Sequence, residues 1–196
     1  MNYLITGAGS GIGRAITVLL AANGHTCFLL GRNENNFGKN DRWNDIIDTN
    51  LTGTYLTVQH FLPALNRSKH NYKQIVITSS VLARLGVANY SAYCASKAGL
   101  LGLMRSWAVE YAQQNILVNA ICPGWVNTDM AQNGLQGIAD GIGITKSDFF
   151  DIAMQSVPLK KMSEPEEVAQ LVNYLLNQTS ITGQTIDINA GSIMNS

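Results

Sequence analysis

The sequence predicts an α/β protein built on a parallel sheet, and three observations carry that prediction. Longer segments with apolar residues at helical spacing separate short apolar runs typical of buried strands. A glycine-rich turn directly follows the first run. Because strands that alternate with helices pair in parallel, we expect one doubly wound, Rossmann-like domain over residues 1–196. The expected strands cover residues 2–6, 25–30, 74–78, 116–121 and 184–188.

Composition and charge argue against several classes of protein. The chain has 196 residues, 46% of them hydrophobic, with 13 basic and 13 acidic side chains. The net charge of zero argues against a nucleic-acid partner, and no apolar run reaches the ~18 residues of a membrane span. Cys27, Cys94 and Cys122 lack paired spacing, so we expect a reducing compartment and no metal site. Strand-like sequence from Asn2 onward leaves no room for a signal peptide, so we expect a cytoplasmic protein.

The turn after the first strand reads G-A-G-S-G-I-G and carries a dinucleotide-binding spacing. Gly7 would allow the tight turn, Gly11 the approach of the backbone to a pyrophosphate, and Gly13 close helix packing. The N-terminus of the helix expected over 12–23 would face the negative charge. The alternative is a glycine-rich turn without a ligand, which the following helix and second strand make less favourable.

The end of the second strand bears on the choice of cofactor. Proteins that bind NAD place an Asp or Glu roughly 20 residues past the glycines, to contact the ribose hydroxyls. This chain has Gly31 there, followed by Arg32, whose guanidinium suits a 2′-phosphate. We therefore expect NADP(H) to be preferred, with NAD(H) as the alternative cofactor. Arg32 could otherwise be an ordinary solvated charge in a loop.

Ser80, Tyr93 and Lys97 form a candidate reactive set. Tyr93 and Lys97 are four residues apart in an expected helix and so share a face, while Ser80 follows the strand expected at 74–78. A cation about 4 Å from a phenolate, at an effective dielectric of about 20, contributes on the order of 4 kcal/mol, or roughly three pKa units. We therefore expect Lys97 to lower the pKa of Tyr93 and Ser80 to hold a substrate oxygen. The alternative is an amphipathic helix with a packed Tyr and a solvated Lys.

These motifs together resemble the short-chain dehydrogenase/reductase family, in particular its 3-oxoacyl-carrier-protein reductase and polyketide ketoreductase branch. The resemblance covers most of residues 1–32 and 36–196. It implies NADP(H)-dependent interconversion of a ketone, such as a 3-oxoacyl thioester, and a secondary alcohol. Tyr93 would then be the general acid. By the same resemblance Asn50 kinks its helix and holds a water connected to Lys97; a helix-surface amide is the alternative.

The resemblance also implies a set of cofactor contacts. Thr128 is expected near the nicotinamide amide or the phosphates, although it could also cap a helix. Val126 is expected to offer backbone contacts to the nicotinamide carboxamide. The full set implied is Gly7, Ser10, Gly11, Ile12, Gly13, Arg32, Tyr93, Lys97, Pro123, Gly124, Val126 and Thr128.

The segment 129–157 is expected to be a mobile substrate lid, because it carries four glycines among apolar side chains after a strand end. Its apolar content favours a small-molecule carbonyl or alcohol substrate with some hydrophobic surface. Ser163 and Glu166 are expected to form the capping box of the next helix. In the family, the helix with Asn50 and the helix that continues beyond Lys97 to about Gln113 form the main subunit interface, which implies a homotetramer or homodimer.

One part of the family pattern is missing from this sequence. Eight residues, 33–40, join the second strand to the next helix, where the family has its third and fourth strands with two helices. That piece needs roughly 50 to 60 residues. Loss of the fourth strand should leave the edge of the first strand exposed or give it a different neighbour.

Three explanations of the missing piece stay open. In the first, the sequence lacks a segment of the protein. In the second, the chain is a genuine deletion that has repacked, with or without strand donation from a partner. In the third, the chain is a degenerate relative with a weakened cofactor site. The last gives a second hypothesis for function, in which a non-catalytic oligomeric binding module has lost the adenine side of the cofactor site.

Overall fold

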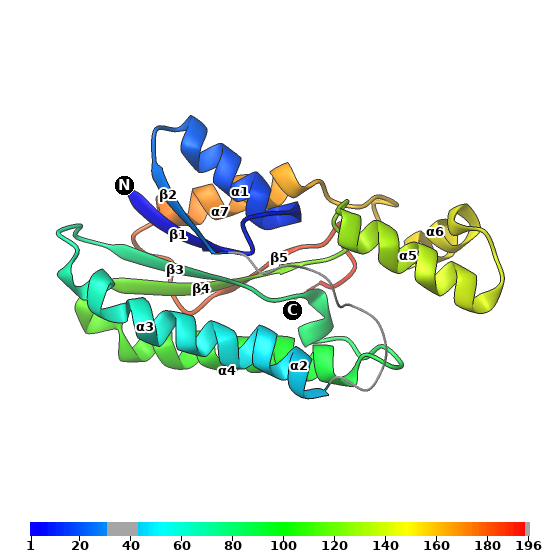
Figure 1. The fold of residues 1–196 in the computed structure, drawn as a ribbon, viewed down its shortest axis with the longest axis horizontal. Helices are drawn as coiled ribbons and strands as arrows, with labels where there is room; N and C mark the ends of the chain where they lie inside the picture. The colour runs from blue at the N-terminus through cyan, green and yellow to red at the C-terminus, as the bar shows by residue number, and fades with distance from the viewer. Residues whose placement is uncertain (31–42, 195–196) are drawn as a thin grey trace. The chain divides into compact units, whose positions relative to one another are not determined.

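The computed structural model describes residues 1–30 and 43–194. Helices and strands alternate along the chain, as the sequence predicts (Figure 1). The strands are β1 Asn2–Thr6, β2 Thr26–Leu30, β3 Lys73–Thr78, β4 Ile116–Pro123 and β5 Thr185–Ile188. The α-helices are α1 Gly11–Ala22, α2 Trp43–Ile47, α3 Gly53–Arg67, α4 Ser91–Glu110, α5 Asp129–Ile142, α6 Lys146–Gln155 and α7 Pro165–Leu176. A π-helical turn, η1, covers Asp48–Thr52, and short 3₁₀ turns cover Val81–Ala83 (η2) and Ala112–Gln114 (η3).

The strands form two parallel sheets rather than one. β1 pairs with β2, with Asn2 opposite Thr26, and a second sheet has the order β3-β4-β5. β3 and β4 pair in parallel with Thr78 opposite Ile121. Within the described residues, β1 hydrogen-bonds to no strand other than β2. This agrees with the expectation that loss of a neighbouring strand leaves an edge of β1 without its usual partner.

The described chain packs as two compact units, which we call unit 1 and unit 2. Unit 1 comprises residues 1–30, 123–174 and 188–194, and unit 2 comprises residues 43–122 and 175–187. The expected α/β class with parallel sheets is confirmed, whereas a single domain over residues 1–196 stays a prediction. No helix in either described stretch combines the length and the apolar character that crossing a bilayer requires.

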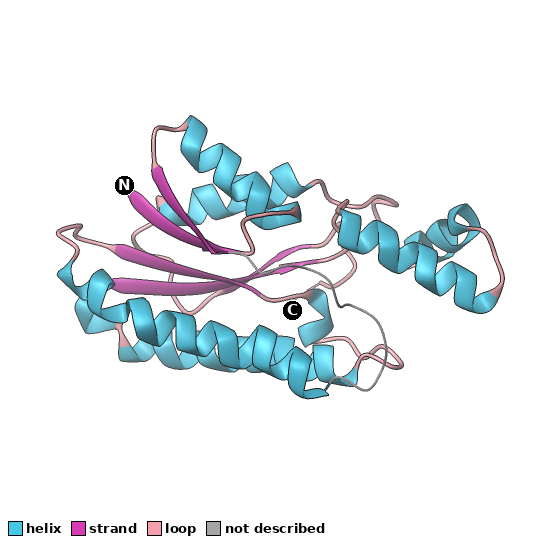
Figure 2. Cartoon of the chain, viewed as in Figure 1, coloured by secondary structure: helices cyan, strands magenta, loops and turns pink. Residues whose placement is uncertain are grey.

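Unit 1 contains a hairpin of α5 and α6 (Figure 2). It also contains the glycine turn, α1 and α7, which line a common groove. The hairpin turns at Gly143, whose positive φ of +74° suits glycine. Leu135 of α5 packs with Met154, Val157 and Met162 in a buried cluster. The sequence did not reveal these two helices, because three glycines interrupt the apolar pattern of α5. The role of 129–157 as a lid stays a prediction.

Unit 2 contains the β3–β4 pair, with α3 and α4 along one of its faces (Figure 1). All eight residues of β4 are buried, as in a strand covered on both faces. Met104 and Trp107 of α4 pack on this pair in the main apolar core. The helix expected from Asp41 onward is not continuous, because η1 interrupts it between α2 and α3.

Candidate active site

Asn50, Ser80, Tyr93 and Lys97 all belong to unit 2. Ser80 lies just after β3, is 8% exposed, and its Oγ accepts a hydrogen bond from the Leu82 N–H at 3.1 Å. This bond caps the short turn η2, so the backbone fixes the position of the hydroxyl. Tyr93 and Lys97 lie in the first two turns of α4, as their spacing predicts.

The phenol of Tyr93 shares a hydrogen bond with the Ser80 side chain. Burial raises the pKa of Tyr93 above its ordinary value, and the bond with Ser80 lowers it in part. A hydroxyl from the end of β3 and a phenol from α4 thus meet, although 13 residues separate them in the sequence. The phenol stays protonated at neutral pH.

Lys97 is directed at the backbone of β3. Its Nζ donates to the Thr78 carbonyl oxygen at 3.0 Å and lies 5.5 Å from the centre of the Tyr93 ring. Burial lowers the pKa of Lys97 to about 8. The expected lowering of the Tyr93 pKa by Lys97 is not found, since desolvation is the largest influence on that phenol and Ser80 supplies the lowering contribution. The ammonium contacts a carbonyl and the ring instead of serving mainly to acidify the hydroxyl.

Asn50 lies in the π-turn η1, which confirms the expected irregularity of its helix. Its Nδ2 donates to the Ser96 Oγ of α4 at 3.1 Å, and its carbonyl oxygen accepts from the Thr54 Oγ1 at 2.7 Å. Single π-turns inside helices often occur at functional sites. The side chain is therefore a contact between two helices of unit 2 and not a helix-surface amide, while its water-holding role stays a prediction.

Sequence reasoning missed two buried serines of this site. Ser96 is discussed below. Ser79 is 3% exposed, and its Oγ donates to the Lys97 carbonyl oxygen at 2.9 Å. This bond is donated from the end of β3 to α4, and the bond from Lys97 to Thr78 is donated from α4 to β3. The two bonds together fix the end of β3 to α4. The Ser79–Ser80 pair after an apolar strand was the only sequence signal that could have pointed to it.

The glycine turn in unit 1 has the geometry expected of it. Gly7 has φ +66° and Gly11 φ +49°, values that favour glycine. A Cβ on Gly13 would overlap the Gly7 carbonyl group, whose carbon would lie only 2.7 Å away. The first turn of α1 therefore packs directly on the preceding loop, as predicted. Ser10 immediately precedes α1 in an extended conformation, and Ile12 lies in its first turn.

The segment after β4 also belongs to unit 1. The backbone of Gly124 lies against Asn189, where a Cβ would be 3.0 Å from the Asn189 Cα. Val126 forms a parallel bridge with Ser163, in which the neighbouring Trp125 carbonyl and Asn127 N–H make the two hydrogen bonds. Because backbone groups alternate in direction along a strand, the N–H of Val126 points away from Ser163.

Thr128 is the N-cap of α5, since its Oγ1 accepts a hydrogen bond from the Ala131 N–H at 3.3 Å. Its methyl group faces Gly11 of the glycine turn, where a Cβ would lie 3.0 Å away. The capping alternative is therefore confirmed, and a cofactor contact by Thr128 stays a prediction. Gly11 and Thr128 border a groove of about 610 Å³ between α1 and α7.

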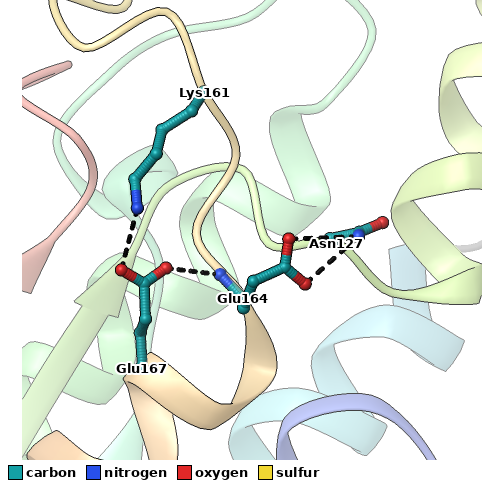
Figure 3. Close-up of polar contacts among 4 residues, drawn as sticks. All are labelled: Asn127, Lys161, Glu164 and Glu167. Atoms are coloured by element: carbon teal, nitrogen blue, oxygen red, sulfur yellow. Dashed lines mark hydrogen bonds and ion pairs between the residues drawn. The ribbon is translucent and has the colours of Figure 1, made fainter.

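The start of α7 is held by carboxylates (Figure 3). Glu167 accepts a hydrogen bond from the Glu164 N–H at 2.7 Å and pairs with Lys161 at 2.8 Å. Glu164 in turn accepts from the Asn127 Nδ2 at 3.1 and 3.2 Å. The expected capping box of Ser163 and Glu166 is wrong by one residue, because Pro165 begins the helix and shifts the cap to Glu164. The loop before Thr128 is thereby fixed to α7.

The residues of unit 1 fit one half of a dinucleotide. They offer a glycine turn with close backbone approach, the N-terminus of a 12-residue helix, and a Val126 N–H that points away from Ser163. Arg32, on which the choice between NADP(H) and NAD(H) depends, lies outside the described residues.

Comparison with known proteins independently supports the family resemblance that the sequence motifs indicate. The family profile described as enoyl-(acyl carrier protein) reductase matches residues 36–192. The predicted ketoacyl reductase of the monensin polyketide synthase from Streptomyces virginiae is 30% identical over 248 residues, which cover 96% of this chain and 95% of the relative. The 3-oxoacyl-[acyl-carrier-protein] reductase FabG of Staphylococcus epidermidis is 34% identical over 158 residues, 80% of this chain.

Solved structures show the same fold. An actinorhodin polyketide ketoreductase variant with NADPH is 25% identical, with a TM-score of 0.83 over 97% of this chain and 96% of that one. Levodione reductase is also 25% identical, with a TM-score of 0.84 and the same coverage. A parallel α/β fold with this glycine turn and this Ser–Tyr–Lys set defines a class of dinucleotide-dependent oxidoreductases. The chain belongs to the short-chain dehydrogenase/reductase family.

The missing piece is visible in the same comparisons. The alignment with the Streptomyces relative extends over 248 residues but includes only 96% of the 196 residues of this chain, so the relative has about 60 residues without a counterpart here. The chain spans only 59% of the length of the staphylococcal reductase. These lengths agree with the piece expected to be absent after Arg32.

Proposed function

We propose that this chain is an NADP(H)-dependent oxidoreductase that interconverts a ketone, such as a 3-oxoacyl thioester, and the matching secondary alcohol. The observation that carries the proposal is the hydrogen-bonded Ser80–Tyr93 pair beside Lys97 in unit 2. The reductase names of the relatives, and the NADPH held by one structural relative, support the reaction class and the cofactor.

The cofactor would be held by the glycine turn, the N-terminus of α1, the Pro123–Thr128 segment and Arg32. NADPH supplies the hydride when it is bound. The chain's own residues supply orientation and the proton. Ser80 would donate to the substrate oxygen and Tyr93 would protonate it as general acid.

The raised pKa of Tyr93 suits the reductive direction, because the phenol holds its proton at neutral pH. Lys97 has a pKa of about 8 and is mostly an ammonium at pH 7. Lys97 loses its charge well below the pH at which Tyr93 titrates, so it does not lower that pKa, but at pH 7 its charge would favour the phenolate that forms as the proton leaves. Its bond to Thr78 holds the charge in place. Asn50 would hold the water through which Tyr93 recovers a proton.

The test is NADPH oxidation with acetoacetyl thioesters and aromatic ketones as substrates. The Tyr93→Phe variant should lose the activity and keep the fold. Tyr90→Phe is the matched control, because Tyr90 lies three residues earlier and is exposed. A fully active Tyr93→Phe enzyme would refute the assignment.

A second candidate is the non-catalytic oligomeric binding module. It is favoured by the pairing of β1 with β2 alone among the described residues, which is the arrangement expected if the neighbouring strand is truly gone. It predicts no NADPH binding in calorimetry, and submicromolar affinity would exclude it. Intact-protein mass decides whether the isolated protein is the 21.2 kDa chain or a longer one.

A homodimer or homotetramer fits the outer surfaces of α3 and α4. These helices expose large apolar side chains, including Tyr55 and Leu56 at 44% and 57% and Val109 at 80%. Exposed apolar surface of this kind is typical of subunit contacts. Light scattering of the purified protein tests the assembly, and a monomer would contradict it. The cytoplasmic location stays a prediction.

A further inference from the structure

Ser96 is a serine of α4 with no exposed surface, and it lies between Tyr93 and Lys97 in the chain. Its Oγ donates to the Tyr93 carbonyl oxygen at 2.8 Å and accepts from the Asn50 Nδ2 at 3.1 Å. The hydroxyl therefore uses its single donor and one of its acceptor sites in hydrogen bonds to candidate site residues.

The contact with Asn50 joins two well-packed elements. Asn50 belongs to η1, and the next residue of that π-turn, Leu51, packs on α4 at Gly99. A Cβ on Gly99 would lie 2.8 Å from the Leu51 Cδ2. Ser96 and Gly99 are three residues apart and share a face of α4. The π-turn is thus attached to that face by a buried hydrogen bond and by close packing one turn later.

The bond to the Tyr93 carbonyl oxygen lies in the helical turn that joins Tyr93 to Lys97. In an α-helix this carbonyl accepts the N–H of Lys97, four residues on. Ser96 adds a second donor to the same oxygen. A serine that bonds back to a helix carbonyl changes the local bend of its helix. The Ser96 hydroxyl is therefore placed to influence the backbone of the turn that carries Tyr93 and Lys97.

We propose that Ser96 is a positioning residue, which transmits the position of Asn50 in the π-turn to the turn of α4 that carries Tyr93 and Lys97. The inference rests on the proposed function and deepens it. Ser96 reaches the chemistry through its two neighbours. A merely structural serine would contribute to stability alone, whereas a positioning serine also sets the turnover rate and the surroundings of the phenol.

The kinetic test compares Ser96→Ala with Ser96→Thr, which keeps the hydroxyl. Loss of one buried hydrogen bond should lower kcat about tenfold, with KM changed less than about twofold, because ground-state binding is retained. Ser96→Thr should recover most of the loss. Adding Asn50→Ala to Ser96→Ala should cost little more than the worse single variant, since both remove the same link.

The control is Thr57→Val, which removes a hydroxyl that bonds the Gly53 carbonyl oxygen at 2.7 Å on neighbouring α3. It should leave kcat and KM unchanged. If Ser96→Ala loses stability as Thr57→Val does and keeps the kcat of the wild type, or if its loss simply adds to that of Asn50→Ala, the proposal is overturned.

A second readout does not require turnover. Carbon-13 NMR of protein labelled at the tyrosine Cζ identifies the Tyr93 signal by its loss in Tyr93→Phe. Ser96→Ala should move that signal and its titration midpoint, and Thr57→Val should not. If the wild type proves inactive, the proposed function fails and this measurement decides the role of Ser96 alone. An unmoved Tyr93 signal in Ser96→Ala overturns the proposal.

Discussion

The ammonium of Lys97 lies 5.5 Å from the centre of the Tyr93 ring. The two side chains are one helical turn apart, yet burial is the largest influence on the pKa of each and moves them in opposite directions, that of the phenol up and that of the amine down to about 8. Burial favours the neutral form of both groups. At neutral pH the pair therefore consists of a protonated phenol beside an ammonium that loses its proton near pH 8.

If the proposed reductase activity is present, its pH dependence should reflect the ionisation of Lys97. The ammonium is present below pH 8 and is lost as pH rises through about 8, whereas the pKa of Tyr93 is raised from 10.0. We expect kcat/KM for the ketone to fall above about pH 8. Lys97→Arg should lose that alkaline limb, since a guanidinium stays charged throughout. A wild-type profile that is flat to pH 10 would contradict the assignment of this limb.

Stability should also depend on pH through Lys97. Its pKa is about 8 in the folded chain and about 10.4 when unfolded, so between these values the unfolded state binds more protons. The free energy of unfolding should therefore rise with pH from about 8 to about 10.4, by about 2 kcal/mol after allowance for partial solvent contact. In urea denaturation at several pH values, Lys97→Met should lack this rise. An equal rise in both proteins would show that other groups cause it.

Two glycines of α4 provide a matched pair. Gly99→Ala should destabilise the protein by about 1 kcal/mol, because the new Cβ meets Leu51, whose side-chain end can shift. Gly102→Ala on the same helix meets nothing within 4 Å and should stabilise by about 0.5–1 kcal/mol. Urea denaturation measures both. Equal effects of the two substitutions would mean that η1 does not pack tightly on α4.

Gly13→Ala should be the more damaging change in unit 1, at about 2–3 kcal/mol, because the Cβ would overlap the backbone of Gly7, which cannot rotate away. Gly134→Ala in α5 is the control, since it meets nothing within 4 Å. Thermal denaturation and NADPH titration should both be affected by Gly13→Ala. Unchanged NADPH affinity in a folded Gly13→Ala protein would separate the glycine turn from cofactor binding.

Much of the candidate site could be predicted from local sequence. The spacing of Tyr93 and Lys97 fixes their common face, and the glycines at 7, 11 and 13 fix a tight turn, because each depends on a few neighbouring residues. The strand β1 was predicted with its observed bounds, Asn2–Thr6.

What could not be predicted depends on contacts between distant residues. The pKa of Tyr93 depends on burial, which a helical spacing does not reveal. The bond from Asn50 to Ser96 joins residues 46 positions apart, and an apolar pattern cannot show that one turn is π-helical. The cap of α7 moved to Glu164 because Pro165 begins that helix, a local rule that outweighed the Ser–Glu pattern.

The π-turn has a consequence for how the gene can change. A turn of this kind holds one more residue than an α-helical turn, so it offsets the helical phase of everything on one side of it by roughly 100°. Deleting one residue between Asp48 and Thr52 would restore regular winding and rotate Asn50 relative to α3. Single-codon insertions and deletions here should therefore be far less tolerated than substitutions, a bias that deep mutational scanning can measure.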